Sequence, residues 1–185
     1  MEFIETILIT NKIENLELHN KRMNNTRYIF FKEKPIDLKE YIKIIKNKRI
    51  RVTYDRKIKK VEYFDLVKKE FKKFKIVHSD IDYSYKFANR EELNKLKEKN
   101  VDEVIIVKNG FITDTTISNL AFFDGKKWIT PKNPLLKGTK REELLNKNFL
   151  IQKDIKVDEI KNFKKFAMIN AIVGFLEIDI KAIIW

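Results

Sequence analysis

The amino-acid sequence predicts an α+β fold in two lobes, a small N-terminal α+β lobe (residues 1–80) and a strand-rich C-terminal lobe (residues 81–185). Short segments in which apolar and polar residues alternate are typical of strands, and they dominate the second half of the chain. Apolar residues at helical spacing are concentrated in the first half. The polar, irregular stretch of residues 79–84 predicts the boundary between the lobes.

The first elements are a strand and a helix. Residues 3–9 alternate and predict a strand, followed by a turn at Asn11-Lys12 and a second short strand. Residues 16–31 carry apolar side chains at helical spacing, with polar side chains between them, and predict a helix. Pro35 follows and is expected to prevent the helix from continuing.

The rest of the first lobe is predicted to be a helix and an antiparallel sheet. Asp37 is expected to cap a helix over residues 38–46. Three alternating segments then predict strands, namely residues 49–54, 59–66 and 71–78. Their alternation indicates one buried and one solvated face.

The second lobe is predicted to open with a helix from residue 89 or 90 to about 99. The apolar run of residues 104–107 predicts a central strand. Asn109-Gly110 and Asp124-Gly125 are strong signals for two hairpins. Residues 140–148 predict a helix, after which strands are expected to close the chain.

The longest apolar stretch, residues 166–185, is interpreted as core strands. Asn, Gly and charged residues interrupt it, whereas a membrane span needs roughly 20 mostly apolar residues. The first ten residues include Glu2 and Glu5 where a secretory signal would carry basic residues. We therefore expect no membrane association and a cytoplasmic location.

The composition narrows the function. The chain has no cysteine and two histidines, so we expect neither disulfides nor a metal site. The net charge of +13 raises the possibility of nucleic-acid binding. Lysines are spread along the whole chain, however, and the densest basic run, residues 56–60, lacks an aromatic stacking partner. We expect no specific nucleic-acid ligand.

An acid and a glycine-threonine pair point to a site for a flat, phosphorylated ring. Asp114 follows a predicted strand, and Gly138-Thr139 opens a predicted helix. Backbone N–H groups at a helix start bind phosphate, and a carboxylate can pair with the ring nitrogen of pyridoxal phosphate. Taken singly, Asp114 is better explained as a turn residue and Thr139 as an ordinary helix cap.

A pyridoxal phosphate enzyme also needs a lysine of lowered amine pKa and a basic group for the phosphate. Lys86 lies at the predicted lobe boundary among aromatic residues, whereas lysines beside the turns are expected in solvent. Arg22 on the first helix could reach the phosphate. From the residues alone, Lys86 is better explained as a strand lysine whose amine reaches water, and Arg22 as a solvated arginine.

Six motifs in order along nearly the whole chain resemble the class IV aminotransferase family, which are fold-type-IV pyridoxal phosphate enzymes. Residues 3–7 are similar to the family's FETI strand, and His19-x-x-Arg22 to its HxxR helix. The other matches are residues 85–90 (the KxxNR lysine segment), residues 109–120 (GxITExxxSNL), Thr130-Pro131 together with residues 138–141 (TP and GTxR), and Asn170-Ala171 (NA).

The resemblance implies a D-amino acid aminotransferase-like fold, a pseudobarrel in the C-terminal lobe, and pyridoxal 5'-phosphate as cofactor. It implies that Lys86 is the catalytic Schiff-base lysine, that Asp114 pairs with the pyridine nitrogen and that Arg22 holds the phosphate. Asn119 is implied to support the loop of Asp114. Backbone groups at four further residues are implied to complete the phosphate site: Thr139, Lys140, Asn170 and Ala171.

Three positions depart from the family pattern. Relatives mostly have Glu where this chain has Asp114, which is one methylene shorter, and Ile4 stands where many have Tyr or Phe. The chain also begins at the FETI strand, where typical members carry a further strand and loop, so we expect a shortened N-terminus. These departures keep open a homologue that binds the cofactor without turnover.

The motifs around Lys86 and Asn170 favour the lyase branch of the family. The expected reaction is that of 4-amino-4-deoxychorismate lyase, which eliminates pyruvate and leaves 4-aminobenzoate for folate synthesis. The alternative is transamination of a branched-chain or D-amino acid. By the same resemblance we expect a homodimer.

Overall fold

The computed structural model describes residues 1–184 and divides into two compact units. Unit 1 contains Met1–Lys68 and Tyr85–Asn89, and unit 2 contains Lys69–Ser84 and the chain from Arg90 onward. The units differ from the predicted lobes, residues 1–80 and 81–185, because residues 74–78 pair with strands of unit 2 and residues 85–89 pair with the first strand of unit 1.

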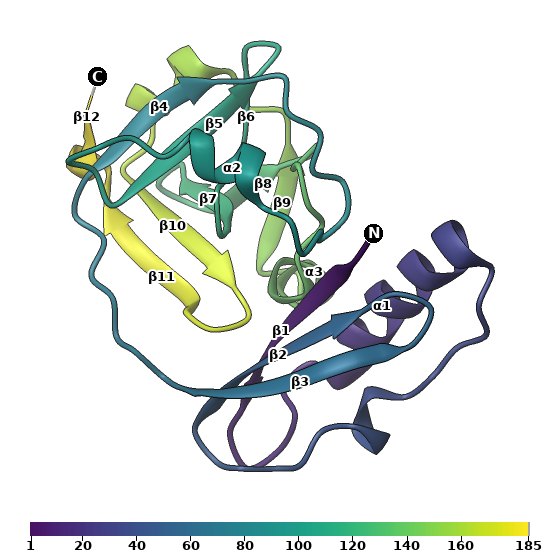
Figure 1. Cartoon of the computed structure of the whole chain (residues 1–185). Coiled ribbons are helices and arrows are strands. Elements are labelled where there is room, and N and C mark those ends of the chain that lie inside the picture. Colours follow the sequence, from purple (N-terminus) through teal and green to yellow (C-terminus); the bar gives the residue numbers. More distant parts are fainter. Residues whose placement is uncertain (185) are drawn as a thin grey trace. The chain divides into compact units, whose positions relative to one another are not determined.

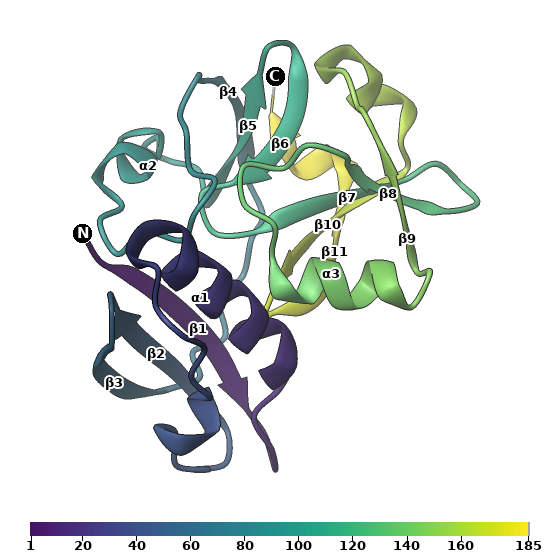
Figure 2. The ribbon, with the colours of Figure 1, turned by 90° about the vertical axis from the view of Figure 1, so that its right-hand side faces the viewer.

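Unit 1 is a three-stranded antiparallel sheet with a helix on one face (Figure 1). The strand order is β1 (Phe3–Ile9), β2 (Lys48–Tyr54) and β3 (Ile58–Asp65). Figure 2 shows α1 (Leu16–Phe31) lying along β1. Apolar side chains from both form the core, because β1 turns alternate residues towards α1.

The predicted strand 3–9 and helix 16–31 of unit 1 are confirmed. The predicted helix 38–46 is wrong, because only a short 3-10 helix, η1 (Leu38–Glu40), forms behind the Asp37 cap. The backbone N–H of Lys43 donates to the Tyr63 hydroxyl, at 2.7 Å, instead of continuing a helical ladder. The second short strand predicted after Asn11-Lys12 is reduced to one bridge between Ile9 and Ile13.

Unit 2 is built on a nine-stranded mixed sheet within the described residues. Its main path runs β11-β10-β7-β6-β5-β4-β12, and β8 pairs with β7 and β9. The first strands along the chain are β4 (Phe74–His78), β5 (Glu103–Lys108), β6 (Phe111–Thr115), β7 (Asn119–Phe123) and β8 (Trp128–Pro131). The later ones are β9 (Leu150–Lys153), β10 (Lys165–Asn170), β11 (Gly174–Asp179) and β12 (Ile183–Ile184).

The helices of unit 2 are short. They are α2 (Glu91–Lys95), α3 (Thr139–Asn146) and two 3-10 helices, η2 (Val157–Asn162) and η3 (Ile180–Ala182). The helix predicted to reach about residue 99 therefore ends earlier than expected, at Lys95. The helix predicted over residues 140–148 is confirmed as α3, with slightly different ends.

Both predicted hairpins form. Asn109 and Gly110 have positive φ angles of 52° and 80° between β5 and β6, as tight hairpin turns with two left-handed residues require. Asp124 caps the turn between β7 and β8 by accepting the N–H groups of Lys126 and Lys127. The assignment of residues 71–78 to an antiparallel sheet with residues 49–54 and 59–66 is wrong, because β4 pairs in parallel with β5.

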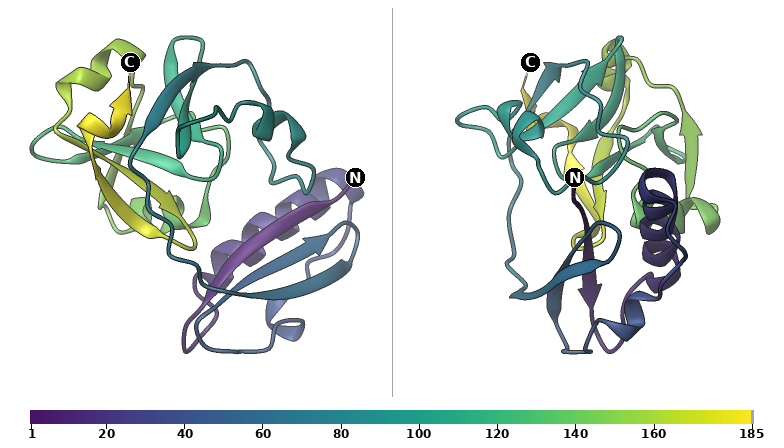
Figure 3. Two further views of the ribbon diagram at one scale, coloured as in Figure 1. Left: turned by 60° about the vertical axis from the view of Figure 1, so that its left-hand side comes forward. Right: turned by 45° about the vertical axis from the view of Figure 1, so that its right-hand side comes forward.

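The apolar end of the chain supplies strands to the core of unit 2, as predicted. Figure 3 shows β10 and β11 as an antiparallel hairpin near the C-terminus. The Phe166 ring packs at 4.9 Å from Phe74 and 6.1 Å from Phe122. Trp185, the last residue of the predicted stretch, lies outside the described residues. No helix within residues 1–184 has both the length and the apolar character needed to cross a bilayer.

Candidate active site

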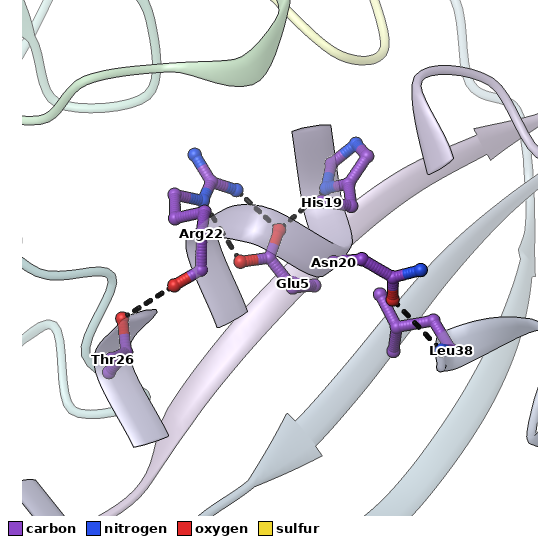
Figure 4. A network of polar contacts seen from close by, with 6 residues as sticks. All are labelled: Glu5, His19, Asn20, Arg22, Thr26 and Leu38. Atoms are coloured by element: carbon purple, nitrogen blue, oxygen red, sulfur yellow. Dashed lines mark hydrogen bonds and ion pairs between the residues drawn. The ribbon is translucent and has the colours of Figure 1, made fainter. Parts of the chain in front are cut away.

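Unit 1 contains a polar network of Glu5, His19 and Arg22, hereafter the Glu5 network, in which Glu5 and His19 are buried and Arg22 is partly buried (Figure 4). Glu5 lies on the face of β1 that points to α1. His19 and Arg22 are three residues apart on α1 and so share one face. His19 Nδ1 lies 2.6 Å from Glu5 Oε2, and Arg22 donates from Nε to Oε1 at 2.9 Å and from Nη2 to Oε2 at 2.5 Å.

The charges of this network are set by burial and by one another. Burial by itself would raise the pKa of Glu5, but the charge of Arg22 and the hydrogen bonds from His19 and Arg22 lower that pKa to about 2. Burial lowers the pKa of His19, and the charges of Arg22 and Lys86 lower it further. The hydrogen bond and the charge of Glu5 act in the opposite direction and raise it. The network therefore holds one anion, one cation and a neutral imidazole at neutral pH.

Lys86 belongs to the same unit as this network. Its carbonyl accepts the N–H of Ile4 at 2.9 Å, and Ala88 N–H donates to the Glu2 carbonyl, so residues 86–88 run beside β1. The ring of Phe87 packs at 5.1 Å from that of Phe3. The Lys86 side chain is half-buried, and its charge contributes to lowering the pKa of His19. The structure thus brings the predicted Lys86 and Arg22 into one unit, around β1.

Unit 2 contains the predicted acid. Asp114 lies near the end of β6 and is directly opposite Asn119, the first residue of β7. Its Oδ1 accepts from Asn119 Nδ2 at 2.8 Å, and its Oδ2 accepts from the Leu136 N–H at 2.9 Å. Burial raises the pKa of Asp114 to about 7, against these hydrogen bonds and the charge of Arg141.

Asn119 joins this acid to the start of α3. In addition to Asp114, its Nδ2 donates to the Leu136 carbonyl at 2.7 Å, and its Oδ1 accepts the Gly138 N–H at 3.1 Å. A Cβ atom on Gly138 would lie only 2.1 Å from Asn119 Oδ1. We refer to Asp114, Asn119, Leu136 and Gly138 as the acid cluster.

The predicted phosphate residues Thr139 and Lys140 form the first turn of α3. The first hydrogen bond of the helix runs from Glu142 N–H to the Gly138 carbonyl, so the N–H groups before Glu142 have no carbonyl partner within the helix. Thr139 is buried. The Lys140 amine pairs with Glu143 at 2.8 Å, so its side chain is engaged along the helix. The groups of this helix start that can bind an anion are therefore its backbone N–H groups rather than the Lys140 amine.

Asn170 and Ala171 lie at the turn between β10 and β11. Asn170 Nδ2 donates to Ser118 Oγ at 2.9 Å, and its Oδ1 accepts the N–H groups of Ile172 and Val173. Asn170 therefore ties this turn to Ser118, next to Asn119. Ala171 contributes only backbone to the turn.

A buried acid, Glu103, and a partly buried arginine, Arg90, of unit 2 escaped the sequence prediction of the site. Glu103 accepts the Thr116 hydroxyl at 2.8 and 2.9 Å, while Arg90 Nη2 donates to the Thr116 carbonyl at 2.6 Å. Both hold the turn between Asp114 and Asn119. Arg90 belongs to the lysine motif and could have been suspected from it, whereas Glu103 carries no sequence signal.

Glu5 belongs to the FETI motif, which by itself predicts no site role for it. Glu5 lies between Phe3 and Ile7 on one face of the predicted strand, so the sequence alone indicates a buried carboxylate. A buried carboxylate requires hydrogen-bond partners. The network confirms that such an acid has them, on α1.

Residues 83–180 match the family model of class IV aminotransferases. The chain belongs to the class IV aminotransferase family. The matched segment contains Lys86, Asp114, α3 and the turn at Asn170.

Two relatives match nearly end to end. An uncharacterised protein of Haemophilus influenzae is 34% identical over 182 residues, which cover 92% of this chain and 97% of that protein. The crystal structure of a proposed 4-amino-4-deoxychorismate lyase from Haemophilus somnus is 32% identical, has a TM-score of 0.88, and is matched over 94% of this chain and 97% of its own.

A more distant structure shows the shared fold. A hypothetical aminotransferase from Mycobacterium tuberculosis, in its PLP-bound form, has a TM-score of 0.75 at 14% identity, over 96% of this chain and 80% of its own. The predicted fold class, an α+β class IV aminotransferase fold of PLP fold type IV, is confirmed.

The donor set of the chain fits pyridoxal phosphate. Unit 1 offers an amine and a guanidinium, and unit 2 offers a buried carboxylate and a helix start at which a Gly138 Cβ would collide with Asn119. These are the groups that an aldehyde, a ring nitrogen and a phosphate require.

We expect the free energy of unfolding of the cofactor-free protein to decrease as the pH rises from about 4 to about 7, because Asp114 titrates in this range. Its pKa is raised from 3.8 to about 7 on folding, so its stabilising contribution is present below pH 3.8 and is lost as the pH rises through 7. At ~1.4 kcal/mol per pKa unit the loss is at most about 4.5 kcal/mol. Urea unfolding at several pH values should show a larger loss of stability with rising pH for the wild type than for Asp114→Asn, because His19, whose lowered pKa acts in the opposite direction, titrates in both.

The matched control is Asp124→Asn. Hydrogen bonds from the Lys127 and Lys126 N–H groups lower the pKa of this exposed hairpin acid, so it titrates below the window. An equal slope in wild type and Asp114→Asn would contradict the raised pKa of Asp114.

Proposed function

We propose that the chain is a pyridoxal phosphate-dependent enzyme that acts on an amino acid or an amino-substituted acid, by the reaction of aminodeoxychorismate lyase. The observation that carries the proposal is the acid cluster, in which a buried carboxylate is joined through one asparagine to the N-terminus of α3. Family membership and the Haemophilus somnus structure support the choice of cofactor and of the lyase reaction.

Each group then has one task. When bound, pyridoxal phosphate supplies an aldehyde for amines and an electron-withdrawing ring. Lys86 Nζ is the attachment point and moves the α-proton of the substrate. The Asp114 carboxylate holds a proton at the ring nitrogen. The Arg22 guanidinium and the backbone at Thr139, Lys140, Asn170 and Ala171 bind the phosphate, and Asn119 orients Asp114.

A pKa of about 7 both helps and hinders Asp114 in holding a proton at the ring nitrogen. Such a carboxylate exchanges a proton readily near neutral pH. It is only partly ionised there, whereas a carboxylate with a low pKa is fully ionised. The charge of Arg141 opposes the pKa rise and so favours the ionised form that a protonated ring nitrogen needs.

We expect purified protein mixed with pyridoxal phosphate to become yellow, and borohydride to fix the label on Lys86. Lys86→Arg should lose at least about 100-fold of the fixed label because a guanidinium does not form the bond. The measurement is peptide mass spectrometry after reduction. Lys108→Arg is the control, since Lys108 donates to the Ile81 carbonyl in unit 2. A label on another lysine, or a colourless wild type, would refute the proposal.

The reaction is decided by two assays run side by side. Release of pyruvate from aminodeoxychorismate without an amino acceptor supports the lyase. Transamination of a branched-chain or D-amino acid, with no pyruvate release, supports the alternative reaction on the same groups. A protein that takes the label on Lys86 and performs neither reaction is a cofactor-binding homologue.

The proposal includes a homodimer in the cytoplasm with no specific nucleic-acid partner. The family resemblance supports the dimer, and the dispersed lysines of a chain with net charge +13 support the lack of nucleic-acid specificity. Sedimentation tests the dimer, and DNA binding that persists at high salt would contradict the last point.

A further inference from the structure

The carboxylate of Glu5 accepts three hydrogen bonds from two residues of α1. Oε1 accepts from Arg22 Nε, and Oε2 accepts from both Arg22 Nη2 and His19 Nδ1. We propose that Glu5 is a positioning residue that fixes the Arg22 guanidinium for the cofactor phosphate, with His19 holding Glu5 in place. This inference rests on the proposed pyridoxal phosphate function and deepens it.

The two bonds from Arg22 explain how an acid can position an arginine. A guanidinium is planar, so bonds from Nε and Nη2 to the two oxygens of one carboxylate fix its plane as well as its distance. The Glu5 side chain is 0% exposed and that of Arg22 is 17% exposed, so the guanidinium is the part of this pair that an anion reaches.

His19 acts from the other side of the carboxylate. The pKa of Glu5 is about 2, so the carboxylate is ionised and can only accept. His19 Nδ1 must therefore carry the proton of the 2.6 Å hydrogen bond. Both side chains are 0% exposed, which leaves this bond unscreened by water. His19 thereby limits the rotation of Glu5, and Glu5 selects one tautomer of His19.

Charge and geometry make opposite predictions, which makes the inference testable. Glu5 reduces the net positive charge near Arg22, so by charge alone its removal would strengthen phosphate binding. If Glu5 acts by positioning, its removal weakens that binding, because the guanidinium loses its fixed plane. A mutation of Glu5 thus separates the two effects by sign.

The experiment compares pyridoxal phosphate with pyridoxal, which lacks the phosphate, as ligands of Glu5→Gln. We expect the variant to bind pyridoxal phosphate about 10- to 100-fold more weakly, as lost charged hydrogen bonds predict, and pyridoxal within about threefold of wild type. Arg22→Lys should show the same phosphate-specific loss, and Glu5→Gln should add little to it. Glu5→Asp, which keeps the charge, should recover part of the affinity.

A second measurement needs no cofactor. Nitrogen NMR of the cofactor-free wild type should show His19 protonated at Nδ1, and Glu5→Gln should redistribute its tautomers. Asp37→Asn is the matched control, because Asp37 also bonds to α1, through Asn20, but outside the network. Circular dichroism checks that each variant is folded.

The outcomes separate the inference from the proposed function. A wild type that binds neither ligand overturns both. A wild type that binds pyridoxal phosphate, with Glu5→Gln binding it as tightly or losing pyridoxal to the same extent, overturns the positioning role and leaves the function standing. A His19 protonated at Nε2 in the wild type also overturns the role.

Discussion

Gly138→Ala should destabilise unit 2 by about 1–3 kcal/mol, the usual cost of overpacking, and should abolish binding of pyridoxal phosphate. The added Cβ would lie 2.1 Å from Asn119 Oδ1, so the asparagine or the start of α3 must move. Either movement breaks the hydrogen bond from Gly138 to Asn119 and loosens the support of Asp114. Thermal unfolding and a spectroscopic titration with the cofactor measure the two effects.

Two variants isolate this cause. Gly138 has ordinary extended angles, φ −74° and ψ 143°, so backbone strain plays no part. Gly110→Ala provides the contrast, because it adds strain at φ +80° with no atom within 4 Å of its Cβ, and should spare cofactor binding. In Asn119→Ala, the further change Gly138→Ala should cost much less than in the wild type. Equal costs in both backgrounds would refute the steric explanation.

The local elements of this fold are largely encoded in local sequence. Leu16–Phe31 is helical because its apolar residues recur at helical spacing, and Met23 from this series is fully buried. Asn109-Gly110 forms the predicted hairpin because two positive φ angles are needed there. In such cases the deciding interactions lie within a few residues of each other.

Pairings between distant segments could not be predicted in this way. The alternating residues of β4 predict a strand. Nothing in the residues between β4 and β5, however, indicates that these two strands pair in parallel. Residues 85–89 join β1 although nearly the whole of unit 1 precedes them in the chain. Alternation defines which face of a strand is buried, and says nothing of the neighbouring strand.

The candidate site shows the same division. Motifs suggested the residues Asp114, Asn119 and Gly138 one by one, but the bonds that join Asp114 and Asn119 to the segment before α3 span 17 to 22 residues. The partners of Glu5 lie 14 and 17 residues away on α1. The sequence suggests such an acid needs partners, and only the packing of the helix on the strand determines which.

Phe3→Ala should destabilise unit 1 by about 3–5 kcal/mol, the usual cost of truncating a fully buried phenylalanine. The ring lies at 4.8 Å from Phe30, 5.1 Å from Phe87 and 5.8 Å from Tyr54, so one truncation removes contacts with α1, the Lys86 segment and β2. Hydrogen exchange of the β1 and β2 amides measures the loss within this unit.

The same change should reduce the fixing of cofactor on Lys86. The Phe3–Phe87 contact and the Ile4 N–H bond to the Lys86 carbonyl hold the lysine segment beside β1, and the first of these is lost. Phe3→Leu should recover most of both the stability and the labelling, since it refills the volume. Phe111→Ala, at a 39% exposed position of unit 2, should change neither. Full labelling of Lys86 in Phe3→Ala would show that this aromatic contact does not position the lysine.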